Sequence, residues 1–177
     1  MNLNEASTEE EDSTKSNIEI VPAISKDIEG IATVLRESFP GKAKYYKIRS
    51  WEHESKKILR SDKGWITFIA VHQGRIVGVL AARHLKTVTP TIRIEWIAVA
   101  KSFRRRGIGK ALFDHLTRWI ATTFFDQQVR ITLRARTDVQ NFYRKLGLRC
   151  YGRGWMKKRI GGQNDELDHS SVARNGK

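Results

Sequence analysis

The chain has 177 residues, of which 40% are hydrophobic and 29% are charged, a balance typical of one globular domain. No apolar run approaches the ~20 residues that a membrane-spanning helix needs, and the acidic start of the chain lacks the basic and apolar regions of a secretory signal. The single cysteine, Cys150, excludes an internal disulfide and a zinc site built from several cysteines, and it favours a reducing, cytoplasmic location.

The net charge of +14 is unevenly distributed along the chain. Residues 1–15 contain five acidic residues and one basic residue, whereas residues 16–160 contain thirty basic and eleven acidic residues. Such a field attracts anions, among them nucleic acid, phosphorylated cofactors and acidic proteins; a charge that serves solubility alone is the alternative. The polar ends predict a disordered acidic tail over 1–16 and a flexible polar tail over 161–177, on either side of a domain over 17–160.

Strand and helix signals alternate through the first half of that domain. The elements predicted from hydrophobic periodicity are a strand over 18–22, a helix from Ser25 to Leu35, a weaker helix over 50–59, and strands over 65–71 and 75–82. Gln73 and Gly74 between the last two strands predict a tight hairpin. Both of these strands are apolar on both faces, so we expect them to lie centrally with helices above and below.

The second half continues the alternation. Its predicted elements are a strand over 92–100, a strong helix over 109–125, a strand over 129–135, a short helix over 137–146 and a last strand over 151–160. Thr137 and Gln140 have the spacing of a capping box at the start of the short helix, and Gly147 suits the position just after its end. The pattern predicts an α/β domain with one sheet and helices on both faces.

The densest chemical signal is the segment 94–116, where a strand runs into a basic, glycine-containing turn that opens an amphipathic helix. Gly107 and Gly109 lack Cβ atoms, so an anion can approach the backbone, and the free N–H groups at the start of a helix attract it. The segment therefore predicts a pyrophosphate site, surrounded by Arg104, Arg105, Arg106 and Lys110. A basic cluster of the nuclear-localisation type beside an ordinary helix start is the alternative.

As a string, this segment resembles motif A of the GNAT superfamily of N-acetyltransferases, in which a strand ending in Val precedes [R/Q]-x-x-G-x-[G/A]. Here Val99 ends the strand and RRRGIG, residues 104–109, fills the loop. Residues 139–148, VQNFYRKLGL, are similar to the family's motif B, although Arg136 stands where many relatives have Asn. The resemblance implies a single α/β domain with a mixed, mostly antiparallel central sheet and helices on both faces.

The resemblance also implies acetyl-CoA as co-substrate and a primary amine as acceptor, and no metal is expected, because the histidines have no metal-ligand spacing. The pyrophosphate would bind the backbone N–H groups of 105–110, and the pantetheine arm would pair like an extra strand with 97–99, beside a bulge in that strand. The cofactor-binding residues implied in this way are Ile97, Ala98, Val99, Arg104, Arg105, Arg106, Gly107, Ile108, Gly109, Lys110 and Phe142.

Acetyl transfer to an amine needs a base and an acid, because a lysine-like amine of pKa ~10.4 is protonated at pH 7 and the leaving thiolate needs a proton. Glu95, on the strand that would flank the thioester, is the candidate base; an ion pair with Arg93 or Arg83, which would weaken it as a base, is the alternative. Tyr143 corresponds to the motif B tyrosine whose hydroxyl can protonate the CoA sulfur. The alternative for Tyr143 is a packed aromatic with a structurally satisfied hydroxyl.

The remaining titratable residues are given no chemical role. The five histidines are scattered and have no metal-ligand spacing. Cys150 is far in sequence from the candidate base, and we expect it to be a buried structural thiol.

Basic residues interleaved with aromatic residues mark the predicted acceptor wall. They lie in 41–49, GKAKYYKIR, and in the closing region 149–159, which contains Tyr151, Arg153, Trp155, Lys157, Lys158 and Arg159. This pattern suits a phosphate backbone with stackable bases, and solvated charges above core aromatics are the alternative. The sequence thus favours an acetyltransferase whose acceptor amine is RNA-linked or on a protein. The competing class is a non-catalytic acyl-CoA-sensing or RNA-binding module, and the sequence leaves open whether the chain forms a homodimer.

Overall fold

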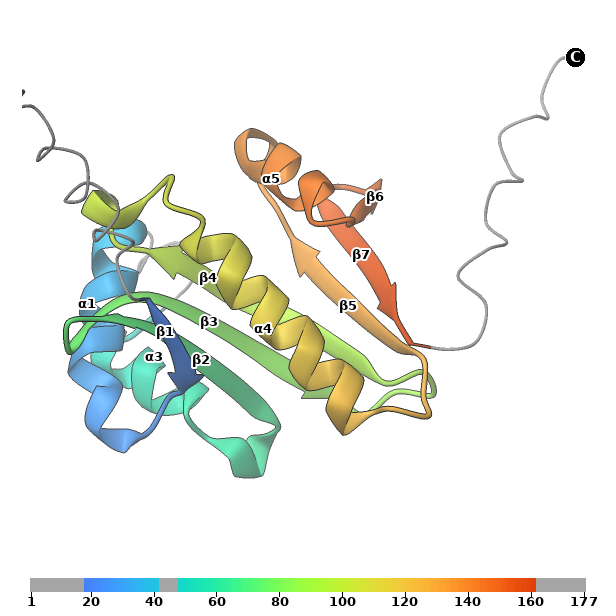
Figure 1. Ribbon diagram of the computed structural model, residues 1–177, viewed down its shortest axis with the longest axis horizontal. Coiled ribbons are helices and arrows are strands. Elements are labelled where there is room, and N and C mark those ends of the chain that lie inside the picture. Colours follow the sequence, from blue (N-terminus) through green and yellow to red (C-terminus); the bar gives the residue numbers. More distant parts are fainter. Residues whose placement is uncertain (1–17, 42–47, 162–177) are drawn as a thin grey trace, which may run out of the picture.

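A seven-stranded sheet organises the computed structural model, which describes residues 18–41 and 48–161 (Figure 1). In spatial order β1-β2-β3-β4-β5-β7-β6, only β4 and β5 are parallel neighbours. The strands are β1 Glu19–Pro22, β2 Trp65–His72, β3 Arg75–Leu85, β4 Thr91–Val99, β5 Val129–Arg134, β6 Arg149–Gly152 and β7 Trp155–Ile160. The predicted fold class is confirmed. The predicted tails, apart from Gly161, lie outside the described residues.

Two tight hairpins connect neighbouring strands, and only the first was predicted. Gln73 and Gly74, at φ values of 48° and 73°, turn β2 into β3 as expected of a two-residue hairpin. The single strand predicted over 151–160 is wrong, because the chain forms β6, reverses and returns as β7. Arg153 and Gly154 have φ values of 45° and 80°, so the reversal uses left-handed backbone in the middle of the expected strand.

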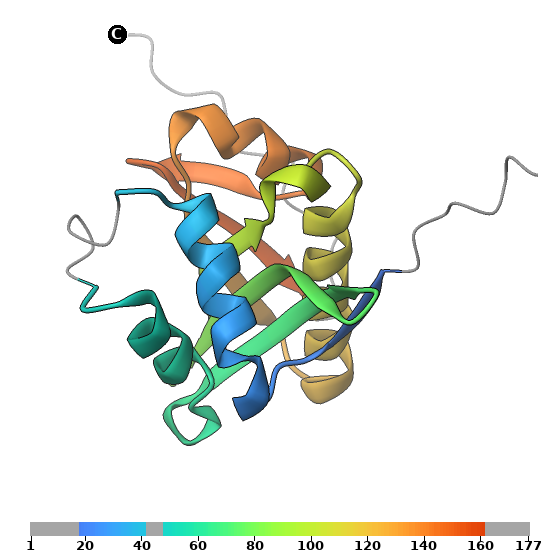
Figure 2. The same cartoon turned by 90° about the vertical axis from the view of Figure 1, so that its left-hand side faces the viewer.

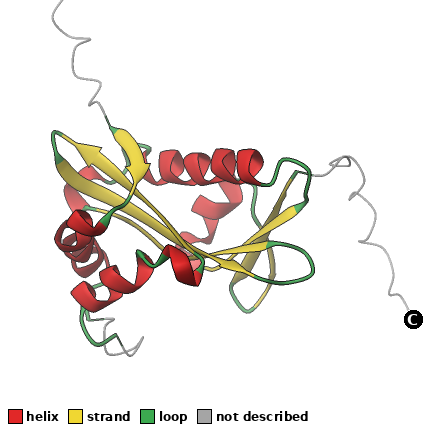
Figure 3. Cartoon of the chain, turned by 90° about the horizontal axis from the view of Figure 1, so that it is seen from below, coloured by secondary structure: helices red, strands yellow, loops and turns green. Residues whose placement is uncertain are grey.

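Helices cover both faces of the sheet (Figures 2 and 3). They are α1 Ile28–Ser38, α3 Trp51–Ile58, α4 Ile108–Thr123 and the short α5 Gln140–Lys145. Two apolar cores result, one beneath α1 and α3 and the other beneath α4 and α5. Leu112, Leu116 and Ile120 form the fully buried stripe of α4, with the four-residue spacing that predicts an amphipathic helix. None of the helices in the described ranges is long and apolar enough to cross a bilayer.

The capping box predicted before α5 is not formed. Residues Thr137–Val139 make a 3-10 turn, and no side chain caps either this turn or α5. The Gln140 side chain instead donates to the Ala135 carbonyl at 3.4 Å, while Arg136 forms an ion pair with Asp138. The predicted end of the helix is confirmed, because Gly147 has a φ of 84° and its N–H donates to the Arg144 carbonyl.

The sheet opens between β4 and β5, and this opening positions the site. Their pairing covers only 91–93 of β4, after which the two strands diverge (Figure 1). On its other side β4 is irregular: Ala81 pairs with Trp96 and Ala82 with Ile94, which leaves Glu95 as the extra residue of a bulge. The bulge expected from the family resemblance is therefore present, at the residue predicted to be the base.

Candidate active site

The loop before α4 presents unpaired backbone donors at the end of β4. Gly107 is the N-cap of α4 with a φ of 79°, and no side chain caps this helix. The backbone N–H groups of 108–110 accordingly have no intrahelical acceptor. Arg105 is also left-handed, with a φ of 67°, which is uncommon for a residue other than glycine. Successive N–H groups in such a loop form a concave anion site, reinforced by the positive end of the 16-residue helix.

The four basic side chains of this loop have different surroundings. Arg104 donates from Nε to the Val99 carbonyl at 3.0 Å, and Arg106 lies over the Phe103 ring at 5.1 Å. Lys110 forms an ion pair with Asp114 at 2.5 Å. Arg105 is exposed and makes no ion pair within the described part of the chain. All four stay near the helix start, so the loop keeps a positive field around its free N–H groups.

The open edge of β4 offers backbone groups beyond the last pairing with β5. The Ala100 N–H donates to Val77 in β3, so the neighbouring residue Val99 is turned away from β3 by the alternation of an antiparallel ladder. Its carbonyl accepts hydrogen bonds from Arg104 and from the Ser38 hydroxyl, the latter at 3.3 Å. By the same alternation Ile97 also faces the open edge. The structure thus brings Ile97 and Val99 to the edge where an added strand can pair.

Motif B contacts motif A through Phe142. A Cβ added to Gly109 would lie 3.2 Å from the Phe142 ring and 3.9 Å from the Val99 side chain, so these three residues meet at the start of α4. Phe142 remains 37% exposed and lies 5.0 Å from the Tyr143 ring in an edge-to-face arrangement. A Cβ at position 109 would be closer to the ring than most Cβ contacts are, so glycine suits this close approach between two segments that are distant in sequence.

Tyr143 lies beneath Phe142, in the core shared by α4 and α5. Its side chain is only 8% exposed, and burial raises the pKa of the Tyr143 phenol well above its ordinary value. The hydroxyl is protonated at neutral pH, as an unshifted phenol of pKa ~10 already is, and burial makes it a weaker acid than an exposed tyrosine. This is the protonation state that an acid for a leaving thiolate requires.

Glu95 lies at the bulge with its carboxylate held by Arg93, whose Nε donates to it at 2.6 Å. The ion pair considered as the alternative to a catalytic role is thus formed. Both side chains remain about one-third exposed. The adjacent Trp96 points to α3, where its Nε1 donates to the buried Glu54 carboxylate at 3.0 Å. Arg93 was named from the sequence as a possible partner of Glu95, whereas Glu54, which is distant in sequence from Trp96, was not singled out.

Two predicted cofactor residues have side chains that face away from the edge. Ala98 is buried in the core beneath α1 and α3, and Ile108 is buried against Gly78 in the core beneath α4. Ile108 can therefore reach a ligand only through its backbone, and the backbone groups of Ala98 face β3, where this residue pairs with Val79. Ser38 and Glu37, at the end of α1, were not predicted: Glu37 accepts a hydrogen bond from the Lys101 N–H at 2.6 Å and so helps to fix the loop after β4.

The prediction of a buried Cys150 is wrong, since the residue is exposed on β6 near the edge of the sheet. Within the predicted acceptor wall, Lys158 is not a surface charge. Its ammonium donates to the Leu146 carbonyl at 3.0 Å and lies 5.8 Å from the Phe113 ring. The basic and aromatic residues expected at 42–47 lie outside the described residues.

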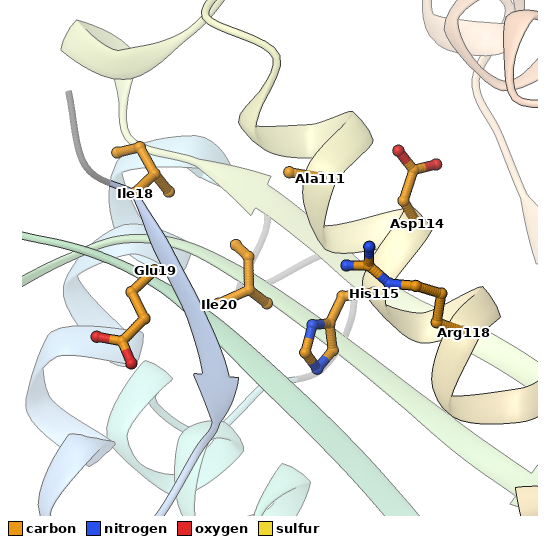
Figure 4. Close-up of a pocket in the computed structure, with 7 residues that line it drawn as sticks. All are labelled: Ile18, Glu19, Ile20, Ala111, Asp114, His115 and Arg118. Carbon is orange, nitrogen blue, oxygen red and sulfur yellow. The ribbon is translucent and has the colours of Figure 1, made fainter. Parts of the chain in front are cut away.

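A separate pocket of about 560 Å³ lies between β1 and α4 (Figure 4). It contains none of the predicted cofactor or catalytic residues, and its lining is Ile18, Glu19, Ile20, Ala111, Asp114, His115 and Arg118. Burial and the neighbouring Arg118 lower the pKa of His115, whose ring packs 4.6 Å from that of Phe68. The pocket is not part of the arrangement at the open edge of β4.

Comparison with known proteins agrees with this arrangement. Residues 28–148 match the Acetyltransferase (GNAT) family, a span that includes β4, the loop before α4, and α5. The chain belongs to the GNAT family. A curated relative, the 5-NmdU N-acetyltransferase of Pseudomonas phage PaMx11, is 33% identical over 94 residues, which cover 51% of this chain. The matched region spans 61% of the length of that relative.

Solved GNAT structures share the fold. An acetyltransferase of the GNAT family from Staphylococcus aureus Mu50 superposes with a TM-score of 0.65 at 18% identity, covering 81% of this chain and 99% of that one. A GNAT family N-acetyltransferase from Escherichia coli, solved in complex with CoA, gives a TM-score of 0.62 at 18% identity, covering 81% and 82% of the two chains. At these identities the comparison supports the GNAT fold of this chain.

Proposed function

We propose that this GNAT protein is an N-acetyltransferase that moves the acetyl group of acetyl-CoA to a primary amine. The observation that carries the proposal is the meeting of three features at one place. The uncapped start of α4, the open edge of β4 and the Phe142-Tyr143 pair of α5 adjoin one another around Gly109 and Val99. The CoA complex of the Escherichia coli neighbour and the reaction in the name of the phage relative support the same activity.

In this proposal the pyrophosphate of acetyl-CoA binds the loop before α4. The backbone N–H groups of 105–110 donate hydrogen bonds to the pyrophosphate oxygens, and the exposed Arg105 adds positive charge. The pantetheine arm pairs with the open edge of β4 at Ile97 and Val99. Because the Val99 carbonyl bonds to Arg104 and Ser38 in the structure, an amide of the arm that pairs with this carbonyl has to replace or share those contacts.

The reaction then needs one acyl transfer and three proton transfers: one from the ammonium group, one to the leaving thiolate and one from the nitrogen of the new amide. Glu95, directly or through a water molecule, takes the proton of the ammonium group, and the neutral amine attacks the thioester carbonyl. The tetrahedral intermediate collapses by breaking the C–S bond, the thiolate takes the proton of the Tyr143 hydroxyl, and the second amine proton leaves the nitrogen and restores the protonated Tyr143, directly or through water. The products are an N-acetyl amide and free CoA. Arg93, which donates a hydrogen bond to Glu95, fixes the position of this carboxylate.

The acceptor is proposed to be an amine carried on a polyanion or a protein, and the location is proposed to be cytoplasmic. The strongly basic composition of 16–160 supports an anionic carrier and disfavours free polyamines, which a positive surface repels. A non-catalytic acyl-CoA-binding module is the second candidate. The ion pair between Arg93 and Glu95 favours that candidate, since it occupies the proposed base.

Release of free CoA from acetyl-CoA tests the proposal. We expect the purified chain to release CoA thiol when a protein lysate, total tRNA or an amine-bearing oligonucleotide is added as acceptor, with the acetyl group recovered on an amine. Calorimetry with acetyl-CoA alone is expected to give a micromolar dissociation constant, which corresponds to a binding free energy of the order of −8 kcal/mol. Binding without transfer to any of these pools would support the non-catalytic module instead.

The role of Glu95 gives a prediction of its own. Glu95→Gln keeps the size of the side chain and removes the base, so turnover is expected to slow and the acidic limb of the pH–rate profile is expected to change. The measurement is kcat and kcat/KM between about pH 5.5 and 9.5 for wild type and variant. Asp62→Gln, at an exposed acid outside the site, is the control for the change in net charge. An unchanged profile would mean that the amine arrives neutral, as an α-amine of pKa ~7.7–8.0 can.

A further inference from the structure

One face of the sheet formed by β5, β7 and β6 is basic, and among the described residues neither apolar core lies on that face. These strands, VRITLR, WMKKRI and RCYG, contain six basic residues and no acidic residue. Their apolar residues, such as Val129, Ile131 and Met156, face the core beneath α4. Among the described residues, the core beneath α1 and α3 contains no residue of these three strands. That core therefore does not cover the opposite face of β5, β7 and β6.

The strand register gathers five basic side chains on that opposite face. Arg130 lies across from Arg159, and Lys157 lies across from Arg149 on one side and Thr132 on the other. Cross-strand partners share a face of the sheet, about 4.8 Å apart, and alternate residues along a strand recur every ~6.7 Å. We call this surface the basic face, and its members are Arg130, Arg134, Arg149, Lys157 and Arg159.

The charges of the basic face are suited to binding an anionic ligand. Like charges directly across from each other destabilise a sheet, and the face has two such pairs, Arg130 with Arg159 and Arg149 with Lys157. None of its five cations forms an ion pair within residues 18–41 and 48–161, whereas the loop and helix cations Lys110, Arg36 and Lys57 do. A regular lattice of cations without carboxylates matches a chain of phosphates.

An exposed aromatic ring lies beside these cations. Tyr151 on β6 is 52% exposed, and the Lys157 ammonium lies 5.5 Å from its ring centre. The bulge between Cys150 and Gly152 places Tyr151 outside the regular backbone pairing, and the exposed part of its ring can contact a ligand. Cations that follow a backbone together with an aromatic ring that stacks a base are the combination used for single-stranded nucleic acid.

The basic face is continuous with the candidate active site. Arg93 of β4 pairs with Thr132 of β5, which pairs in turn with Lys157 of β7, so one row of residues runs across the sheet from the partner of Glu95 to the basic face. We propose that this face binds a single-stranded nucleic acid that carries the acceptor amine to Glu95. The inference rests on the proposed function only in taking the bound strand as the acetyl acceptor.

Direct binding of labelled oligonucleotides tests the surface without any catalysis. The probes are a 12-residue single-stranded DNA, the RNA of the same sequence, and the DNA duplex, measured by fluorescence anisotropy between about 50 and 200 mM salt. We expect single strands to bind with a Kd in the range of about 1–100 µM near physiological salt. In the double variant Arg130→Gln, Arg159→Gln the slope of log K against log salt is expected to flatten by about 1.4, because each lost phosphate contact changes it by about 0.7.

A matched variant separates the surface from net charge. Lys26→Gln, Arg75→Gln removes the same two charges from exposed positions on η1 (Ser25–Asp27) and at the β2–β3 hairpin, and its slope is expected to equal that of wild type. Tyr151→Ala is expected to weaken single-strand binding about 5- to 150-fold, the loss of one stacked base, and to leave duplex binding unchanged. Equal slopes in the two double variants, or tighter binding to poly-glutamate than to oligonucleotides, would overturn the proposal.

The outcomes separate this inference from the proposed function. If acetyl transfer to small amines is found but the basic face fails these tests, the enzyme stands and its acceptor is not carried on nucleic acid. If oligonucleotides bind through the basic face and no acetyl transfer occurs with any acceptor, the surface stands and the proposed function fails. Thermal unfolding of each variant checks folding, and removal of the Arg130–Arg159 pair is expected not to lower the melting temperature.

Discussion

Replacing Gly107 with Asp is expected to weaken the binding of CoA about a hundredfold or more. The N-cap position of α4 is where the proposed pyrophosphate meets the backbone N–H groups, and the space around the missing Cβ is open. A carboxylate there occupies that space and repels the phosphates by about 1 kcal/mol per charge pair at 4 Å in water and by about 4 kcal/mol near a protein surface. The measurement is the dissociation constant for CoA by calorimetry.

The backbone at Gly107 requires a control, because its φ of 79° strains any residue with a side chain. Gly107→Asn has the same shape as the Asp variant, tolerates the left-handed region about as well and carries no charge. It is expected to bind CoA much more tightly than Gly107→Asp does. Gly74→Asp, at the equally left-handed and open turn of the β2–β3 hairpin, is expected to bind CoA as wild type does. If folded Gly107→Asp bound CoA normally, the assignment of the loop would be wrong.

Local patterns in the sequence predicted the elements that place this loop. The four-residue apolar spacing of α4 predicts the buried stripe of Leu112, Leu116 and Ile120, because residues four apart lie on the same face of a helix of 3.6 residues per turn. Gly107 and Gly109 were singled out because an anion can approach a backbone that lacks Cβ atoms, which stays a prediction, and the structure gives further reasons for glycine at both positions. Gly107 is left-handed, and Gly109 lies against the Phe142 ring.

Features that depend on partners distant in sequence could not be predicted in the same way. The bulge at Glu95 changes which residues face α4, from Ile92 and Ile94 before it to Ile97 and Val99 after it. Both pairs of residues are apolar, so the hydrophobic pattern of the sequence does not show where the buried face of β4 changes. The bonds from Ser38 and Arg104 to the Val99 carbonyl likewise need α1 and the loop to be brought together by the sheet.

The hairpin between β6 and β7 was missed for another reason. Its reversal uses left-handed backbone at Arg153, a residue type that rarely marks a turn, with Gly152 and Gly154 on either side. The two glycines were the signal that the sequence offered. The structure gives the reason for the second one, because a Cβ at Gly154 would lie 2.7 Å from the Ala135 carbonyl oxygen. Recognising two strands here matters for function, because only the second strand, β7, pairs with β5 and aligns Arg159 with Arg130 on the basic face.

Removing the Tyr143 hydroxyl is expected to slow acetyl transfer roughly ten- to a thousandfold without weakening CoA binding. At neutral pH the hydroxyl holds a proton to give to the leaving thiolate, although burial raises the pKa of this phenol and makes the transfer less favourable than from an exposed tyrosine. Tyr143→Phe keeps the ring in the core beneath α5 and removes only the donor. The measurement is kcat with acetyl-CoA and a fixed amine, together with the dissociation constant for CoA.

Tyr151→Phe removes the same atom from the exposed tyrosine of β6 and is the matched control, with a kcat on a small amine expected to equal that of wild type. The leaving group provides a second test of the role of Tyr143. An acetyl donor with a less basic thiol depends less on a proton from the enzyme, so the ratio of wild-type to Tyr143→Phe rates is expected to fall towards one with such donors. A purely structural tyrosine would slow all donors equally and would shift the melting temperature. A constant ratio across donors would therefore remove Tyr143 from the chemical step and leave it as part of the core that holds Phe142 against Gly109.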